Sequence, residues 1–91
     1  MPVWTKPALS DIDNIFKYIA NDDEGAARSV ARKIYDASKE LDKYPQVGRK
    51  GTVTGTRELI IPRWPYILIY RHQERSALEI LRVLHAKQKW P

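Results

Sequence analysis

The sequence predicts a two-layer α+β domain, in which an N-terminal helix hairpin packs on one face of an antiparallel β-sheet. Two observations lead to this prediction. Apolar residues recur at helical spacing in the first half of the chain and alternate at strand spacing after Gly55. The segment from Thr56 to His72 also holds two apolar runs around a breaker bounded by prolines, which is typical of a β-hairpin. A chain of 91 residues is long enough for one domain, which we expect to span residues 1–91.

The chain begins with a short apolar segment, residues 2–5, that suits an edge strand. A first helix is expected over residues 7–20, because Pro7 is compatible with a first helical turn, where its missing N–H is not needed. One apolar stripe follows at helical spacing. It consists of Leu9, Ile12, Ile15, Phe16 and Ile19.

A second helix is expected over residues 24–43. The polar run at residues 21–23 can end the first helix and cap the second, and Tyr44-Pro45 ends the second. Small residues on its stripe allow a neighbouring helix to approach closely. The stripe consists of Ala27, Val30, Ala31, Ile34, Ala37, Ser38 and Leu41. The segment at residues 45–56, which holds three of the four glycines, is expected to be a loop that carries Arg49 and Lys50.

Three strands are expected over residues 57–61, 66–72 and 77–84, joined by short turns into an antiparallel meander. Alternation would place Tyr66, Leu68 and Tyr70 on one face of the middle strand, and Ile67 and Ile69 on the other. The last strand would place Leu78, Ile80 and Leu84 on one side, and Leu81 and Val83 on the other. Both faces are therefore apolar, and the helix hairpin can cover only one of them.

The uncovered face has two possible explanations. The C-terminal segment could fold back over it, with Trp90 as the covering side chain. Alternatively, the face is a docking site for a partner, since an exposed apolar patch with a cationic rim is typical of protein–protein sites. The rim would consist of Arg57, Arg63, Arg71, Arg75 and Arg82.

The net charge of +5 is unevenly distributed. Residues 45–91 contain nine Lys and Arg against three Asp and Glu, whereas residues 1–44 contain seven against eight. The positive charge therefore lies on the sheet half, where it would attract a nucleic acid or an acidic protein segment. The alternative is a solvated basic surface that only keeps the protein in solution.

No motif for a metal, a cofactor or a nucleophilic enzyme is present. The chain has no cysteine and two widely spaced histidines, so we expect no metal and no cofactor. Neither a signal peptide nor a transmembrane run is recognisable, so we expect a cytoplasmic protein without membrane contact. His85 is the one residue near the end of the sheet that suits proton transfer. It should lie on the side of Leu81 and Val83.

The order of strand, helix hairpin, loop and three-stranded meander resembles the RelE/ParE superfamily of bacterial toxins. The residues that carry the resemblance are Ala8-Leu9, Asp11-Ile12, Tyr18-Ile19, Pro45, Gly48-Arg49, Thr56-Arg57-Glu58-Leu59, Pro65-Tyr66-Ile67, Tyr70, Ile80-Leu81-Arg82-Val83-Leu84-His85 and Trp90-Pro91. The resemblance implies a toxin of a type II toxin–antitoxin module, neutralised by a cognate antitoxin in a hetero-oligomer. Members similar to RelE cut mRNA on the ribosome, and members similar to ParE poison DNA gyrase.

The residues at the ribonuclease positions favour the ParE branch. Relatives that cut mRNA carry cations where this chain has Glu58, Ile60 and Ile67, and a tyrosine can stand where it has Ala86. Only His85 matches.

The leading expectation is therefore a protein that binds and poisons DNA gyrase and has no catalytic residue. The antitoxin would bind at Arg57, Arg63, Arg71 and Arg82, and the target at Lys87, Lys89 and Trp90. One alternative is a ribosome-dependent mRNA endoribonuclease that uses His85, Arg57 and Arg82. The other is an interaction module without toxicity.

Overall fold

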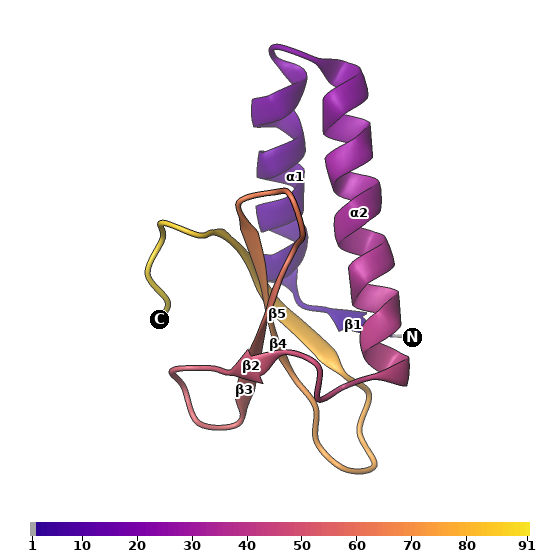
Figure 1. The fold of residues 1–91 in the computed structure, drawn as a ribbon, viewed down its shortest axis with the longest axis vertical. Coiled ribbons are helices and arrows are strands. Elements are labelled where there is room, and N and C mark those ends of the chain that lie inside the picture. Colours follow the sequence, from indigo (N-terminus) through magenta and orange to yellow (C-terminus); the bar gives the residue numbers. More distant parts are fainter. Residues whose placement is uncertain (1) are drawn as a thin grey trace.

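A computed structural model of the chain describes residues 2–91 as two layers (Figure 1). The elements are β1 (Val3–Trp4), α1 (Lys6–Ala20), α2 (Glu24–Lys43), β2 (Arg49–Lys50), β3 (Thr56–Ile60), β4 (Tyr66–Arg71) and β5 (Glu79–His85). The helix hairpin and the meander both form as predicted, with strand limits that differ by one or two residues. The predicted α+β fold class is thereby confirmed.

The sheet has five strands in the order β1-β5-β4-β3-β2. The three meander strands pair antiparallel, whereas β1 pairs parallel with β5 at the edge of the sheet. The sheet is therefore mixed, whereas the sequence predicted a purely antiparallel sheet. The predicted loop at residues 45–56 also contains a strand, because the two residues of β2 pair with β3.

Each helix is capped by a side chain that the sequence offers at its start. Thr5 caps α1 by accepting a hydrogen bond from the Ala8 N–H at 3.3 Å, and Asp23 caps α2 by accepting one from the Ala26 N–H at 3.0 Å. Such caps pair backbone donors that a helix leaves without an internal partner. The cap of α2 confirms the predicted role of the polar run at residues 21–23.

The core lies between the helix hairpin and one face of the sheet. Its buried members come from both helices and from β4 and β5. They include Ala8, Ile12, Val30, Ile34, Leu41, Leu68, Tyr70, Ile80 and Val83. Leu9, which the helical spacing placed on the apolar stripe, is instead 45% exposed, and Ala8 occupies the core position.

A β-bulge in β5 changes which side chains face the core. Ile69 of β4 pairs with Arg82, but the next residue, Tyr70, pairs with Ile80, so Leu81 is an extra residue. The extra residue shifts the alternation by one position. As a result Val83 joins Leu78 and Ile80 in the core, and Leu84 faces away from it. The predicted faces of Val83 and Leu84 were therefore wrong.

Candidate functional site

The sheet face opposite the helices forms an open cleft of about 390 Å³. Its floor is apolar and comes from the central strands, namely Ile67 and Ile69 of β4 and Leu84 of β5. Arg49 and Glu58 line one wall, and their side chains form an ion pair with Nη2 and Oε1 3.0 Å apart. Ile60 of β3, which pairs with Ile67 and therefore shares its face of the sheet, is 53% exposed. We call this site the open-face cleft.

The C-terminal segment forms the other wall of the open-face cleft. A turn reverses the chain after β5, because the Gln88 N–H donates to the His85 carbonyl at 2.9 Å. The Gln88 side-chain carbonyl also accepts the His85 N–H at 2.7 Å. The chain then runs back to Trp90, which is half-buried and lines the cleft. This position agrees with the first of the two explanations for the second sheet face, in which Trp90 packs on its own domain.

Among the residues expected to bind the target, only Trp90 is partly covered. Lys87 and Lys89 are both exposed on the returning segment. Lys89 also lines the cleft, so a cation and an aromatic ring stand together at its C-terminal wall.

His85 lies at the end of β5 with one ring nitrogen engaged. Its Nδ1 accepts a hydrogen bond from the Lys87 N–H at 3.1 Å, and its ring meets the edge of Tyr66 at a centroid distance of 5.9 Å. This contact places His85 on the Tyr66 side of the sheet, which is also the side of Val83, so His85 shares a side with Val83 as predicted. Burial raises the pKa of Tyr66 above its ordinary value of 10.0, with a smaller contribution from Tyr18. The phenol beside His85 is therefore neutral at physiological pH.

The structure does not bring Arg57 near His85. Arg57 pairs with Tyr70 and His85 pairs with Tyr66, four residues apart along β4, which corresponds to roughly 13 Å of strand. Arg57 also donates through Nη1 to the Gly48 carbonyl at 2.7 Å. The three residues of the ribonuclease alternative therefore do not converge on one point.

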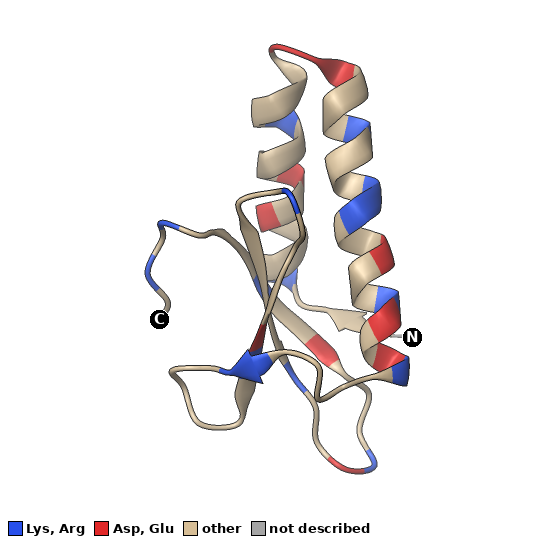
Figure 2. Cartoon of the chain, viewed as in Figure 1, with Lys and Arg blue, Asp and Glu red and all other residues tan. Residues whose placement is uncertain are grey.

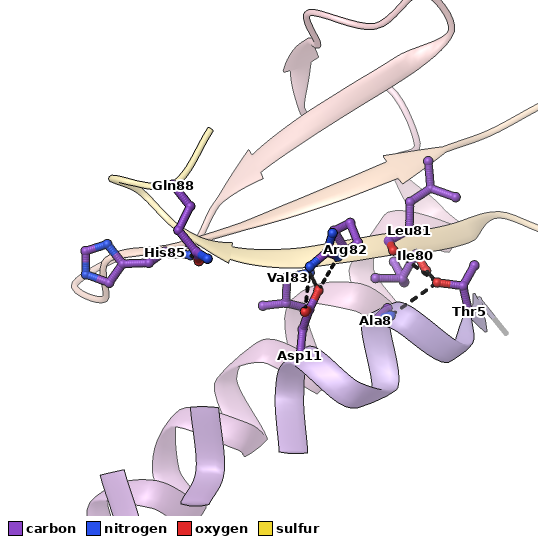
Figure 3. A network of polar contacts seen from close by, with 9 residues as sticks. All are labelled: Thr5, Ala8, Asp11, Ile80, Leu81, Arg82, Val83, His85 and Gln88. Atoms are coloured by element: carbon purple, nitrogen blue, oxygen red, sulfur yellow. Dashed lines mark hydrogen bonds and ion pairs between the residues drawn. The ribbon is translucent and has the colours of Figure 1, made fainter. Parts of the chain in front are cut away.

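Arg82, the third residue of that alternative, is held in an internal network (Figure 3). Its Nε and Nη2 donate to the two carboxylate oxygens of Asp11 in α1 at 2.7 and 2.9 Å. The same carboxylate accepts the Val83 N–H at 2.9 Å. The hydrogen bond with Asp11 raises the pKa of Arg82, so its charge is permanent. This carboxylate binds β5 just after the bulge and fastens α1 to the sheet.

Thr5 completes this network on the other side of the bulge. Its hydroxyl lies 3.1 Å from the Ile80 carbonyl and 3.0 Å from the Leu81 carbonyl, so it donates to acceptors at the bulge (Figure 3). No pattern in the sequence indicates this arrangement, because the partners lie more than 70 positions apart.

The other expected antitoxin contacts lie in separate places. Arg71 shares the face of Ile67 and Ile69 by alternation, and its Nη2 lies 2.7 Å from Oε1 of Glu79. Arg63 is exposed in the turn between β3 and β4, with a left-handed φ of 71°. Arg57, in contrast, shares the face of Tyr70, opposite the cleft. Of the predicted rim, the side chains of Arg63 and Arg75 make no hydrogen bond or ion pair within residues 2–91.

Tyr70 fixes the loop that leads from α2 to β2. Its hydroxyl donates to the Pro45 carbonyl at 2.8 Å and accepts the Gly48 N–H at 2.9 Å. A side chain at position 48 would place its Cβ 2.7 Å from this hydroxyl, so a glycine is needed there. The loop backbone is thus held in place from inside the core.

Within residues 2–91, no three side chains of His, Asp or Glu are grouped so that they could hold a metal ion. Over the same residues, neither helix combines the length and the apolar character that crossing a bilayer requires.

These features define a class of small α+β protein in which a helix hairpin covers one face of the sheet and an open cleft lies on the other. Residues 3–90 match the family model described as the ParE toxin of the type II toxin–antitoxin system parDE. The chain belongs to this ParE toxin family.

Individual relatives agree with the family. Y4kP of Sinorhizobium fredii, a protein named as a toxin, is 44% identical over 88 residues, which cover 97% of this chain and 90% of that protein. Toxin RelE2 of Caulobacter vibrioides is 33% identical over 84 residues, 92% of each chain. A solved structure of the chromosomal ParDE toxin–antitoxin system from P. aeruginosa superposes with a TM-score of 0.80 at 28% identity, covering 93% of this chain and 95% of that one.

Proposed function

We propose that this ParE-family toxin acts by binding and poisoning DNA gyrase, without catalysis of its own. The observation that carries the proposal is the open-face cleft, which offers an apolar floor and a charged rim. Of the acid–base residues in its lining, Glu58 is ion-paired with Arg49, and the ring of His85 packs on Tyr66. Gyrase passes DNA through a transient double-strand break. A bound protein that stalls resealing therefore needs an adhesive surface and no active site.

The C-terminal segment is the proposed target contact. Lys87 and Lys89 are exposed cations beside Trp90, and aromatic residues are enriched at the centres of protein interfaces. Because Trp90 already lines the open-face cleft, we propose that the two lysines supply most of the contact with gyrase.

We further propose that a cognate antitoxin neutralises the toxin by covering the open-face cleft in a hetero-oligomer. An amphipathic helix laid into the cleft or a strand added at the edge of the sheet would each bury Ile60 and Ile67. Arg63 and Arg71 lie where an acidic segment of the antitoxin could reach them. Arg82 would act indirectly, by holding β5 in place, and Arg57 would contribute from the opposite face.

The target is tested with purified gyrase. The toxin should inhibit supercoiling and trap cleaved DNA, and the double variant Lys87→Ala, Lys89→Ala should weaken inhibition by about tenfold, since each lost contact contributes roughly 0.7 kcal/mol. The matched control is Lys39→Ala, Lys43→Ala, which removes the same charge from α2. A toxin that binds its antitoxin but has no effect on gyrase would overturn this target.

The ribonuclease alternative rests on the accessible nitrogen of His85. Nδ1 accepts the Lys87 N–H, and Nε2 makes no hydrogen bond within residues 2–91, so it is available for proton transfer. The test is ribosomes programmed with a defined mRNA. Cleavage that depends on His85 would establish this alternative and remove the gyrase proposal.

A further inference from the structure

A second hollow lies at the other end of β3, where the loop at residues 51–55 meets the sheet. It has a volume of about 450 Å³, and its lining includes Lys50, Thr54, Arg57 and His72. Lys50 and Arg57 are paired neighbours in β2 and β3, so their side chains point to the same side. The hollow adjoins the loop at residues 51–55. We call it the anion hollow.

The lining of the anion hollow is cationic and polar throughout. It holds two permanent positive charges, from Lys50 and Arg57, and the imidazole of His72, which donates an N–H in either protonation state. The remaining side chains of the lining are threonines, and the described lining contains no carboxylate and no aliphatic or aromatic side chain. Such a set matches an oxyanion with several acceptor atoms and offers nothing to an apolar ligand.

These donors are free to bind a ligand, unlike the other cations of the sheet. Arg49, Arg71 and Arg82 each form an ion pair with a carboxylate. Within residues 2–91, the side chains of Lys50 and His72 make neither a hydrogen bond nor an ion pair. The positive charge of this end of the sheet is therefore uncompensated at the anion hollow, where β2 consists of two cationic residues (Figure 2).

Arg57 is both oriented and partly available. Its Nη1 donates to the Gly48 and Gln46 carbonyls at 2.7 and 3.4 Å, which holds the guanidinium in one place. Nε and Nη2 have no partner within residues 2–91. A fixed guanidinium with two free donors loses little entropy when it binds a phosphate.

The loop beside these cations is closed on itself. The Gly51 N–H donates to the Thr56 carbonyl at 2.9 Å, and the Thr56 hydroxyl donates to the Val53 carbonyl at 2.6 Å. Gly55 has a φ of 87°, which only a glycine adopts readily and which lets the loop turn back into β3. Thr52 and Thr54 thereby present their hydroxyls from an ordered loop.

We propose that the anion hollow binds a backbone phosphate of duplex DNA. The phosphate follows from the donor set alone. The choice of DNA rests on the proposed function, because gyrase holds a cleaved duplex, and a toxin that also grips a phosphate of that duplex would hinder its resealing. An acidic peptide is the poorer match. A peptide segment also presents apolar side chains, and the hollow has no apolar side chain to contact them.

The test uses the toxin and DNA without gyrase, so its outcome is independent of the gyrase proposal. Binding of a labelled duplex of about 20 base pairs is measured by fluorescence anisotropy at about 50 mM salt and upwards. The variant Lys50→Ala, His72→Ala should bind at least about tenfold more weakly, and the dependence of log K on log salt should lose a slope of about 1. Both residues are exposed and unpaired in the described chain, so the fold should be unchanged.

The control is Lys39→Ala, which removes the same formal charge from α2 and should alter affinity less than about twofold. Equal losses in both variants, or no binding of the duplex by the parent protein, would overturn the proposal. Two further probes separate the sources of the anion. Inorganic phosphate should compete only at high concentration, and tighter binding of a single-stranded RNA of equal length through the same residues would overturn the choice of DNA.

Discussion

The two faces of the sheet are built from similar apolar side chains but are covered in different ways. On the closed face, the helix hairpin packs over β4 and β5, and Leu68 and Ile80 are completely buried. On the other face, a returning segment of a few residues is the cover, and exposure ranges from 2% at Ile69 to 53% at Ile60. The comparison indicates that the closed face carries most of the stabilising burial, whereas the other face keeps part of its apolar surface exposed.

The largest expected difference in stability is between variants of two neighbouring residues of β4 that lie on opposite faces of the sheet. Leu68→Ala should lower the free energy of unfolding by about 3 kcal/mol, because it leaves a cavity in the closed core. Ile67→Ala, on the half-buried side, should cost about 1 kcal/mol. Urea unfolding followed by circular dichroism measures both. Similar losses would mean that the open-face cleft is part of the stabilising core.

The next effect concerns the connection of α1 to β5. Asp11→Ala should lower the free energy of unfolding by about 2 kcal/mol, because it leaves Arg82 and the Val83 N–H without their partner. The matched control is Asp13→Ala, which removes only the exposed pair with Lys17 and should cost about 0.5 kcal/mol or less. Thermal melts of both variants measure the difference. Equal shifts of Tm in the two variants would contradict the stabilising role of the network around Asp11.

Tyr70→Phe should cost about 1–2 kcal/mol, since the Gly48 N–H and the Pro45 carbonyl lose their buried partner. Amide exchange at residues 45–48 should become faster in this variant. Tyr66→Phe serves as the control, because the Tyr66 hydroxyl makes no hydrogen bond within residues 2–91. A Tyr70 variant with unchanged exchange at Gly48 would contradict the role assigned to the hydroxyl.

On the open face, Trp90→Ala should cost about 1 kcal/mol, because the ring is half-buried against the cleft. Faster amide exchange at Leu84 would accompany the loss of this cover. If stability is unchanged while inhibition of gyrase falls, Trp90 is a contact residue of the target and not a cover of the sheet.

The smallest effect is expected at His85. His85→Ala should leave most of the toxicity, because a toxin that acts by binding loses only local packing against Tyr66. Acid–base catalysis would instead lose about a hundredfold or more in rate. Growth arrest after induced expression is the readout, with protein levels checked. Abolished toxicity in a folded variant would favour the ribonuclease alternative.

The sequence was sufficient for the elements but not for their tertiary connections. Helical and strand periods predicted both helices and the three long strands, because each segment is long enough to show its period. The bulge at Leu81 was invisible, since an apolar residue inserted among apolar residues leaves the pattern unbroken, and the face of Leu84 was misjudged for that reason. β2 was missed because two cationic residues show no alternation.

The sequence predicted the general character of the candidate site but not the positions and contacts of its side chains. Two apolar sheet faces and a basic second half predicted a charged, adhesive surface. The sequence does not reveal which arginines are already paired, because Arg82 meets Asp11 across 71 positions and Arg71 meets Glu79 across a turn. The unpaired side chains of Lys50 and His72 were for the same reason not singled out.

The place of β5 in the sheet has a consequence for how the chain folds as it is synthesised. β5 lies between β1 and β4, so the pairing of Val3 with Glu79 must wait until β5 has left the ribosome. Until then the helix hairpin has most of its apolar stripe uncovered. Contacts of such long sequence separation make folding slow compared with that of a simple helical protein. The open-face cleft and the contact of α1 with β5 therefore form late in the folding of each molecule.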